Sequence, residues 1–98
     1  MYKVFYLDEV ENDIVVAKLW YAEQQKDLDM RFSAAVKEAL SNILKMPSAY
    51  SVRYRNIRIA HIKFFPYNIH FYIDEIKAQI VIIGIVHNKR NNALFLDR

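Results

Sequence analysis

The sequence predicts an α+β fold: a helical hairpin packed on one face of a small, mainly antiparallel four-stranded sheet, in the order β-α-α-β-β-β. Three patterns predict it. Apolar residues recur every three or four positions through most of the first half, residues 67–73 alternate between apolar and polar side chains, and residues 80–86 are apolar throughout. A chain of 98 residues has room for one core, so we expect a single domain over residues 1–98.

The chain opens with a predicted strand and a long helix. Residues 2–7 are mostly aromatic or aliphatic, as is typical of a strand, and Asp8 followed by Glu11 resembles a capping box. One stripe of the helix is formed by Val10, Ile14, Ala17 and Tyr21. The apolar surface is widened by Val15, Val16, Leu19 and Trp20. We therefore expect much of this helix to be covered by other parts of the protein or by a partner.

A second amphipathic helix follows a polar turn at residues 24–27. Asp27 or Asp29 is suited to cap it, and its end is predicted at Met46, because a residue that precedes proline disfavours helical backbone. Its apolar face is formed by Phe32, Ala35, Val36, Ala39, Leu40, Ile43 and Leu44. Two helices joined by so short a turn predict an antiparallel hairpin.

The second half changes to a period of two. It predicts extended segments over residues 52–63, 67–73 and 80–86, separated by turns at 64–66 and 74–78. The last segment is apolar on both faces, which places it inside the sheet. We expect one face of the sheet to carry the helices and the other to form a partly open, concave binding surface.

Charge is unevenly distributed along the chain. Residues 1–50 hold six lysines and arginines against eight acidic residues, whereas residues 51–98 hold eight against three. The net charges of the two halves are therefore −2 and +5. A basic half favours a partner that carries phosphates or carboxylates, although a solvated surface would give the same pattern.

Several chemistries are excluded or disfavoured. The chain has no cysteine and a single glycine, so it can form no disulfide, thiolate site or glycine-rich phosphate loop. Its three histidines lack the close spacing of a metal site, and we expect no metal and no cofactor. No apolar run approaches the roughly 20 residues that span a membrane. The absence of cysteine is compatible with the cytoplasm, where we expect the protein to act.

Basic residues and histidines remain as the candidate site. The candidate binding residues are Arg53, Arg55, Arg58, Lys63, Lys89 and Arg98, and the candidate catalytic residues are Arg90, His87 and His61. Arginine binds phosphate or carboxylate, and a histidine near cations can transfer protons during RNA cleavage. Arg53 and Arg55 are equally suited to bind acidic residues of a protein partner. We expect His70 to be a surface or cross-strand residue, and Tyr67 and Phe71 to pack in the core.

The order of these segments and motifs along the chain resembles that of the RelE/ParE superfamily of toxins from type II toxin–antitoxin systems. The likeness covers nearly the whole chain. It includes Trp20-Tyr21, Arg31-Phe32, Phe65-Pro66-Tyr67 and the run His87-Asn88-Lys89-Arg90-Asn91 after the apolar strand, with Arg98 also retained. The order β-α-α-β-β-β agrees with the fold that this resemblance implies.

The resemblance implies a growth-inhibiting toxin that a cognate antitoxin neutralises. The target would be ribosome-bound mRNA, as for RelE-like endoribonucleases, or gyrase, as for ParE-like proteins. Asn68 stands where the ribosome-dependent nucleases carry arginine, and Ile59 and His61 stand where they carry lysines. This incomplete set leaves gyrase as a strong rival target and leaves enzymatic activity open.

Two other functions fit the same residues. One is a small, basic, non-enzymatic nucleic-acid-binding domain, and the other is an inactive homologue that still binds an antitoxin. We expect an acidic antitoxin tail to fold onto the basic surface and along the helices. No membrane partner is expected, and self-association is left open.

Overall fold

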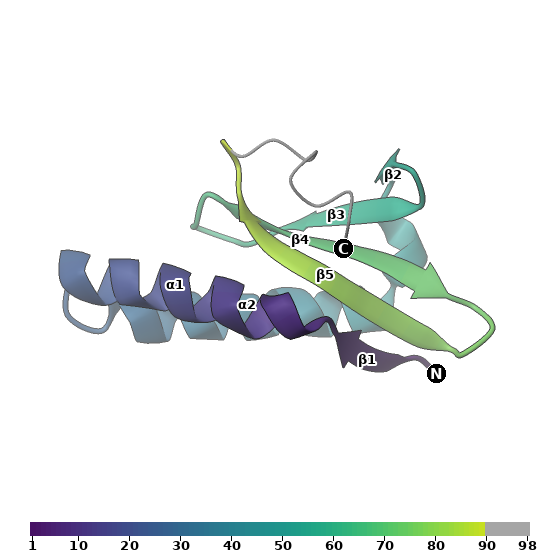
Figure 1. The fold of residues 1–98 in the computed structure, drawn as a ribbon, viewed down its shortest axis with the longest axis horizontal. Helices are drawn as coiled ribbons and strands as arrows, with labels where there is room; N and C mark the ends of the chain where they lie inside the picture. Colours follow the sequence, from purple (N-terminus) through teal and green to yellow (C-terminus); the bar gives the residue numbers. More distant parts are fainter. Residues whose placement is uncertain (90–98) are drawn as a thin grey trace.

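The computed structural model describes residues 1–89 and confirms the α+β architecture (Figure 1). The elements are, in chain order, β1 (Lys3–Tyr6), α1 (Asp8–Gln24), α2 (Leu28–Lys45), the 3₁₀ turn η1 (Pro47–Ala49), β2 (Val52–Tyr54), β3 (Ile57–His61), β4 (Tyr67–Asp74) and β5 (Gln79–His87). The two helices lie antiparallel along one side of the sheet, and the tip of their hairpin extends past the strands (Figure 1).

The sheet has five strands, so the prediction of four is wrong in this detail. The segment 52–63 is not one extended strand, because the chain reverses at Arg55-Asn56 and gives the antiparallel pair β2 and β3. Arg55 adopts left-handed backbone with φ 49°, which allows this tight reversal. Nothing in its local sequence marks the turn with glycine or proline, the usual signals.

The strand order is β1-β5-β4-β3-β2. β1 pairs with β5 in parallel, and the other neighbours are antiparallel. The apolar strand β5 lies inside the sheet between β1 and β4, as its composition predicts. A register shift interrupts β4 and β5 where His70 pairs with Gly84 and Phe71 pairs with Ile82. This bulge contains the only glycine of the chain.

The main core lies between the helical hairpin and the sheet. Its largest fully buried side chains include Phe32, Ile43, Ile62, Ile69, Phe71, Ile80 and Ile82. Phe71 and Tyr67 pack there as expected, Phe71 fully buried and Tyr67 half-buried. Rings from the helices and the sheet also meet edge to face, and Phe32 lies 5.2 Å from Phe65 between ring centroids.

Neither helix begins with the predicted side-chain cap. The cap position of α1 is Leu7, and Asp8 is already the first helical residue, where it faces the positive end of the helix dipole. Asp27 does occupy the cap position of α2, but with left-handed backbone (φ 64°) and no capping hydrogen bond from its side chain.

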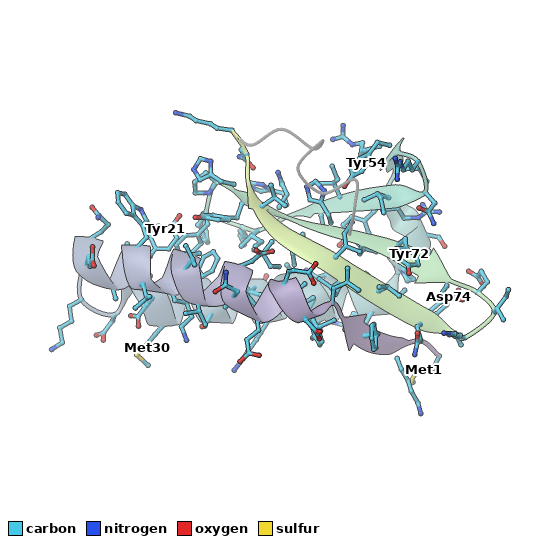
Figure 2. The ribbon with its side chains drawn as sticks, viewed as in Figure 1. Met1, Tyr21, Met30, Tyr54, Tyr72 and Asp74 are labelled. Carbon is cyan, nitrogen blue, oxygen red and sulfur yellow. The ribbon has the colours of Figure 1, made fainter. Side chains whose placement is uncertain are left out.

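The face of the sheet opposite the helices was expected to be partly open, but it also carries buried side chains. Ile57, Val81 and Ile83 form a second buried cluster there, with Tyr54 and Tyr72, both labelled in Figure 2, packed against it. His70 is only 2 % exposed, so the expectation of a surface histidine is wrong, although the residue does pair across strands with Ile59 and Gly84. The alternation of β4 correctly assigned His70 to this face but could not tell that the face is covered.

Helix α1 is apolar on two sides and buries only one. Val10, Ala17 and Tyr21 are in the core. The outer stripe, by which we mean Val15, Val16, Leu19 and Trp20, is 46 %, 52 %, 62 % and 57 % exposed. The described part of the protein therefore does not cover the outer stripe, which faces solvent, and of the two expected covers only a partner is left.

Candidate functional site

Polar side chains from three adjacent strands gather at one end of the sheet. This sheet-end cluster consists of His61, Lys63, Asn68, His87, Asn88 and Lys89. The strand register brings it together, because His61 pairs with Asn68 and Tyr67 pairs with His87 across neighbouring strands. Residues from the end of β3, the start of β4 and the end of β5 therefore meet, although they are up to 28 positions apart in the sequence.

Asn68 connects the cluster through two hydrogen bonds. Its Nδ2 donates to Oδ1 of Asn88 over 2.6 Å, and its Oδ1 lies 3.2 Å from Nδ1 of His61. An amide oxygen can only accept, so Nδ1 of His61 carries the proton of this bond. In the neutral ring Nε2 is then free of hydrogen, which suits His61 to accept a proton there.

His87 has the opposite tautomer. The backbone N–H of Lys89 donates to its Nδ1 over 3.1 Å, so Nε2 carries the hydrogen of the neutral ring. The ring packs edge to face on Tyr67 at 5.1 Å between centroids. It also lines a cavity of about 220 Å³ together with Asn12 and Asp13 of α1. The two histidines thus offer one hydrogen-bond acceptor nitrogen and one hydrogen-bond donor nitrogen at the same end of the sheet, His61 beside Asn68 and His87 beside Tyr67 and α1.

The turn between β3 and β4 presents an aromatic ring beside this cluster. Phe64 is 83 % exposed and has left-handed backbone with φ 71°. The ammonium of Lys63 lies 5.1 Å from the centroid of its ring, and the turn is tied to β5 by the N–H of Asn88, which donates to the carbonyl of Pro66 over 2.8 Å. Sequence reasoning missed Phe64, because only the structure reveals its exposure and backbone.

The candidate arginines lie elsewhere. Arg53 on β2 and Arg55 in the following turn are exposed, and both lie at the opposite end of β3 from His61. β3 has five residues, so its two ends lie roughly 13 Å apart. Arg58 is half-buried and donates from Nη1 to the carbonyl of Tyr50, so it fastens the segment after α2. Arg90 and Arg98 lie outside the described residues.

Apart from Arg58, the candidate cations that the structure describes therefore form two separate groups. Lys63 and Lys89 belong to the sheet-end cluster, and the hairpin cations Arg53 and Arg55 form the other group. Asn88, which holds Asn68, and Asp13, which contacts the backbone of β5, were also missed by sequence reasoning. Their spacing in the sequence gives no signal, because only the register of the strands brings them to their partners.

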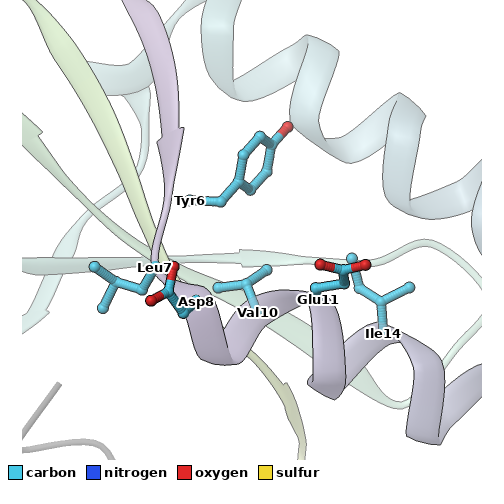
Figure 3. A pocket seen from close by; sticks show the side chains of 6 residues that line it. All are labelled: Tyr6, Leu7, Asp8, Val10, Glu11 and Ile14. Atoms are coloured by element: carbon cyan, nitrogen blue, oxygen red, sulfur yellow. The ribbon is translucent and has the colours of Figure 1, made fainter.

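Another cavity lies away from the sheet-end cluster. It has a volume of about 340 Å³ and lies beside β1 and the start of α1, lined by Tyr6, Leu7, Asp8, Val10, Glu11 and Ile14 (Figure 3). None of the predicted site residues lines it. Within residues 1–89, no group of three histidine or acidic side chains could hold a metal ion. Neither described helix is long and apolar enough to cross a membrane.

The helical hairpin and the mixed five-stranded sheet are the fold expected of the RelE/ParE superfamily of toxins, and a family model assigns the chain to that class. The chain belongs to the family described as "ParE toxin of type II toxin-antitoxin system, parDE", whose model matches residues 2–92. A search of curated proteins found no match.

Two solved structures share the fold. The chromosomal ParDE toxin–antitoxin system from P. aeruginosa contains a chain that is 12 % identical, with a TM-score of 0.76, and the match covers 89 % of this chain and 96 % of that one. The toxin–antitoxin complex RelBE2 from Mycobacterium tuberculosis matches at 17 % identity and a TM-score of 0.59, covering 88 % and 96 %. At these identities the likeness supports the fold and not the details of the site.

Proposed function

We propose that this protein is a cytoplasmic, growth-inhibiting toxin that a cognate antitoxin neutralises by binding along α1. The observation that carries this proposal is the exposed outer stripe. Four large apolar side chains on one helix face, each about half exposed, are costly in water and are typical of a surface that a partner covers. Both structural relatives are described as toxin–antitoxin assemblies, which supports a partner of this kind.

The chemistry of the outer stripe fits an amphipathic acidic segment. Val15 and Leu19 border a shallow cavity of about 230 Å³ that also includes Lys18 and Asp29. An apolar residue of the antitoxin would fill this cavity, and an acidic neighbour would pair with Lys18. A segment that folds on binding would bury the outer stripe and gain the hydrophobic free energy that the toxin alone leaves unused.

Co-expression with the neighbouring reading frame tests this partner. The protein alone should arrest growth, and co-expression should restore growth and yield a co-purified complex. Leu19→Ser should weaken the complex by about tenfold or more, because it removes a large side chain from the interface. Met30→Ser, at an equally exposed apolar residue on α2, is the matched control and should change little. Absence of both toxicity and a partner would contradict the proposal.

For the target, we propose a ParE-like action on gyrase that needs no bond cleavage by the toxin. The family model supports this choice, as does the uncharged, hydrogen-bonded Asn68 at the centre of the sheet-end cluster. The exposed hairpin cations would then contact acidic groups of the target. Purified protein should inhibit supercoiling by gyrase and leave mRNA intact. Arg53→Glu with Arg55→Glu should reduce the inhibition, and Lys37→Glu on α2 serves as the charge-reversal control.

One feature favours cleavage of mRNA as a second candidate. His61 and His87 lie at the same end of the sheet, and general acid–base cleavage of RNA uses one neutral imidazole as the base and one imidazolium as the acid. A strand of RNA would have to cross the end of the sheet to reach both, because their strand partners Asn68 and Tyr67 are consecutive and face opposite sides. In this case His61 would accept the proton of the attacking 2′-hydroxyl and His87 would protonate the leaving oxygen. Arg90 would stabilise the charge on the phosphate. Arg90→Ala should then abolish cleavage that transcript mapping detects, and unchanged cleavage would refute this role.

A further inference from the structure

Phe64 combines three properties that a turn residue rarely has together. It is a bulky aromatic residue, it has left-handed backbone at φ 71°, and it is 83 % exposed. Left-handed backbone is unfavourable for any residue with a Cβ, and glycine would adopt it without that cost. The described residues give the ring no aromatic partner, so packing inside the fold does not explain its presence.

The surroundings of the ring point to its ligand. The Lys63 ammonium lies 5.1 Å from the ring centroid, and the turn is bonded to Asn88, which immediately precedes Lys89. Carboxamides and an exposed imidazole, from Asn68, Asn88 and His61, complete the sheet-end cluster. An accessible aromatic ring among lysines and polar groups is suited to a planar base with a charged backbone. A protein partner would instead need an apolar surface around the ring, and the sheet-end cluster is polar. One acidic side chain, Glu38 of α2, lines a small cavity together with His61 and Lys63.

We propose that Phe64 is a stacking platform for one base of a single-stranded nucleic acid, with the flanking phosphates held by Lys63 and Lys89. The left-handed turn projects the ring away from the core, which is why a residue unsuited to this backbone occupies the position. This contact deepens the second candidate function, on which it rests for the choice of RNA as the principal ligand. Binding by the purified protein is measured separately from cleavage and from growth arrest, so each can fail on its own.

The test measures the binding of a fluorescein-labelled 12-nucleotide oligouridine to the full-length protein by anisotropy at low salt. Wild-type protein should bind saturably, and raising the salt concentration should weaken binding because phosphates are neutralised. Phe64→Leu should weaken binding by about 5- to 100-fold through the loss of stacking, and Phe64→Tyr should bind within about threefold of wild type. A 12-base-pair duplex of the same length should respond little to either change, since its bases are already stacked.

Phe64→Gly separates stacking from a structural role. Glycine relieves the left-handed backbone, so this variant should unfold at the same temperature as wild type or at a higher one while losing affinity for oligouridine. Three outcomes overturn the proposal. These are the absence of saturable binding by wild-type protein, equal affinity of Phe64→Leu and wild type, and weaker binding of Phe64→Leu to a co-purified protein partner with unchanged binding to oligouridine.

Discussion

The hydroxyl of Tyr54 lies 2.9 Å from Nδ1 of His70 and joins β2 to β4 across the intervening strand β3. The two rings are also in contact, at 5.8 Å between centroids. His70 is almost fully buried, and this burial lowers its pKa from 6.5 to about 4. The histidine is therefore neutral at physiological pH, and the pair fastens the short hairpin that carries Arg53 and Arg55.

The pKa of His70 predicts a loss of stability in mild acid. In the unfolded chain the imidazole takes up a proton below pH 6.5, whereas in the folded protein it does so only near pH 4. Stability due to this group is therefore complete above pH 6.5 and falls as the pH decreases towards 4. The loss should reach roughly 2 kcal/mol at pH 5. Urea unfolding at pH 7 and pH 5 measures it.

Two substitutions isolate this effect from the titration of carboxylates. His70→Gln removes the titrating group, so the difference in unfolding free energy between pH 7 and pH 5 should shrink by about the same 2 kcal/mol. His61→Gln, which removes an imidazole from an exposed position, is the matched control. An equal pH dependence of wild type and His70→Gln would contradict the assignment.

Removing the Tyr54 hydroxyl should loosen the β2–β3 hairpin. Tyr54→Phe keeps the ring and deletes the hydrogen bond to His70, which should lower the free energy of unfolding by about 1 kcal/mol. Amide hydrogens of β2 should also exchange faster, because the hairpin loses its attachment to β4. Tyr72→Phe is the matched control on the same face, since the structure gives its hydroxyl no hydrogen bond within residues 1–89. Similar losses in both variants would argue against a specific role for the Tyr54 bond.

Asp13 of α1 accepts a backbone hydrogen bond from β5 at a point that β1 does not reach. β1 pairs with β5 only as far as Tyr6 opposite Ile82, and the N–H of the buried Ile85 donates instead to Oδ2 of Asp13 over 3.1 Å. Asp13→Ala should leave this amide without its acceptor and lower the free energy of unfolding by about 1–3 kcal/mol. Denaturant unfolding measures the change.

The control for Asp13 is Glu23→Ala, which removes an exposed acidic residue from the same helix and should change stability by less than about 0.5 kcal/mol. If the two variants are equally stable, the bond to Ile85 contributes nothing to the attachment of α1 to the sheet.

Ala78 offers a stabilising substitution. It has left-handed backbone, with φ 52°, in the turn between β4 and β5, and its carbonyl accepts from the N–H of Lys3. Ala78→Gly should raise the free energy of unfolding by about 0.5–1 kcal/mol, because glycine has no Cβ to clash in this conformation. Ala34→Gly, at an exposed position inside α2, should have the opposite sign and cost about 1 kcal/mol. A loss of stability in both variants would contradict the prediction.

Local sequence patterns predicted most of the helices and strands, but they did not predict the arrangement of the candidate site. Spacings of three and four residues located both helices, and alternation located β4, because these periods follow directly from backbone geometry. The turn at Arg55 escaped prediction because its left-handed residue is not glycine or asparagine. The sheet-end histidines were identified as candidates from residue type alone, while Phe64 and Asn88 were missed, since their significance arises from exposure and cross-strand contacts.

The sequence by itself determined the classes of secondary structure, the apolar strand inside the sheet, the uneven charge and the membership of a toxin superfamily. Only the tertiary structure decided that His70 is buried against Tyr54, that Arg58 holds the segment after α2, and that the other described candidate cations lie in two groups at opposite ends of the sheet. The physical reason is that local periodicity fixes which face a side chain occupies, whereas strand register and the packing of distant segments fix what covers that face and which residues meet there.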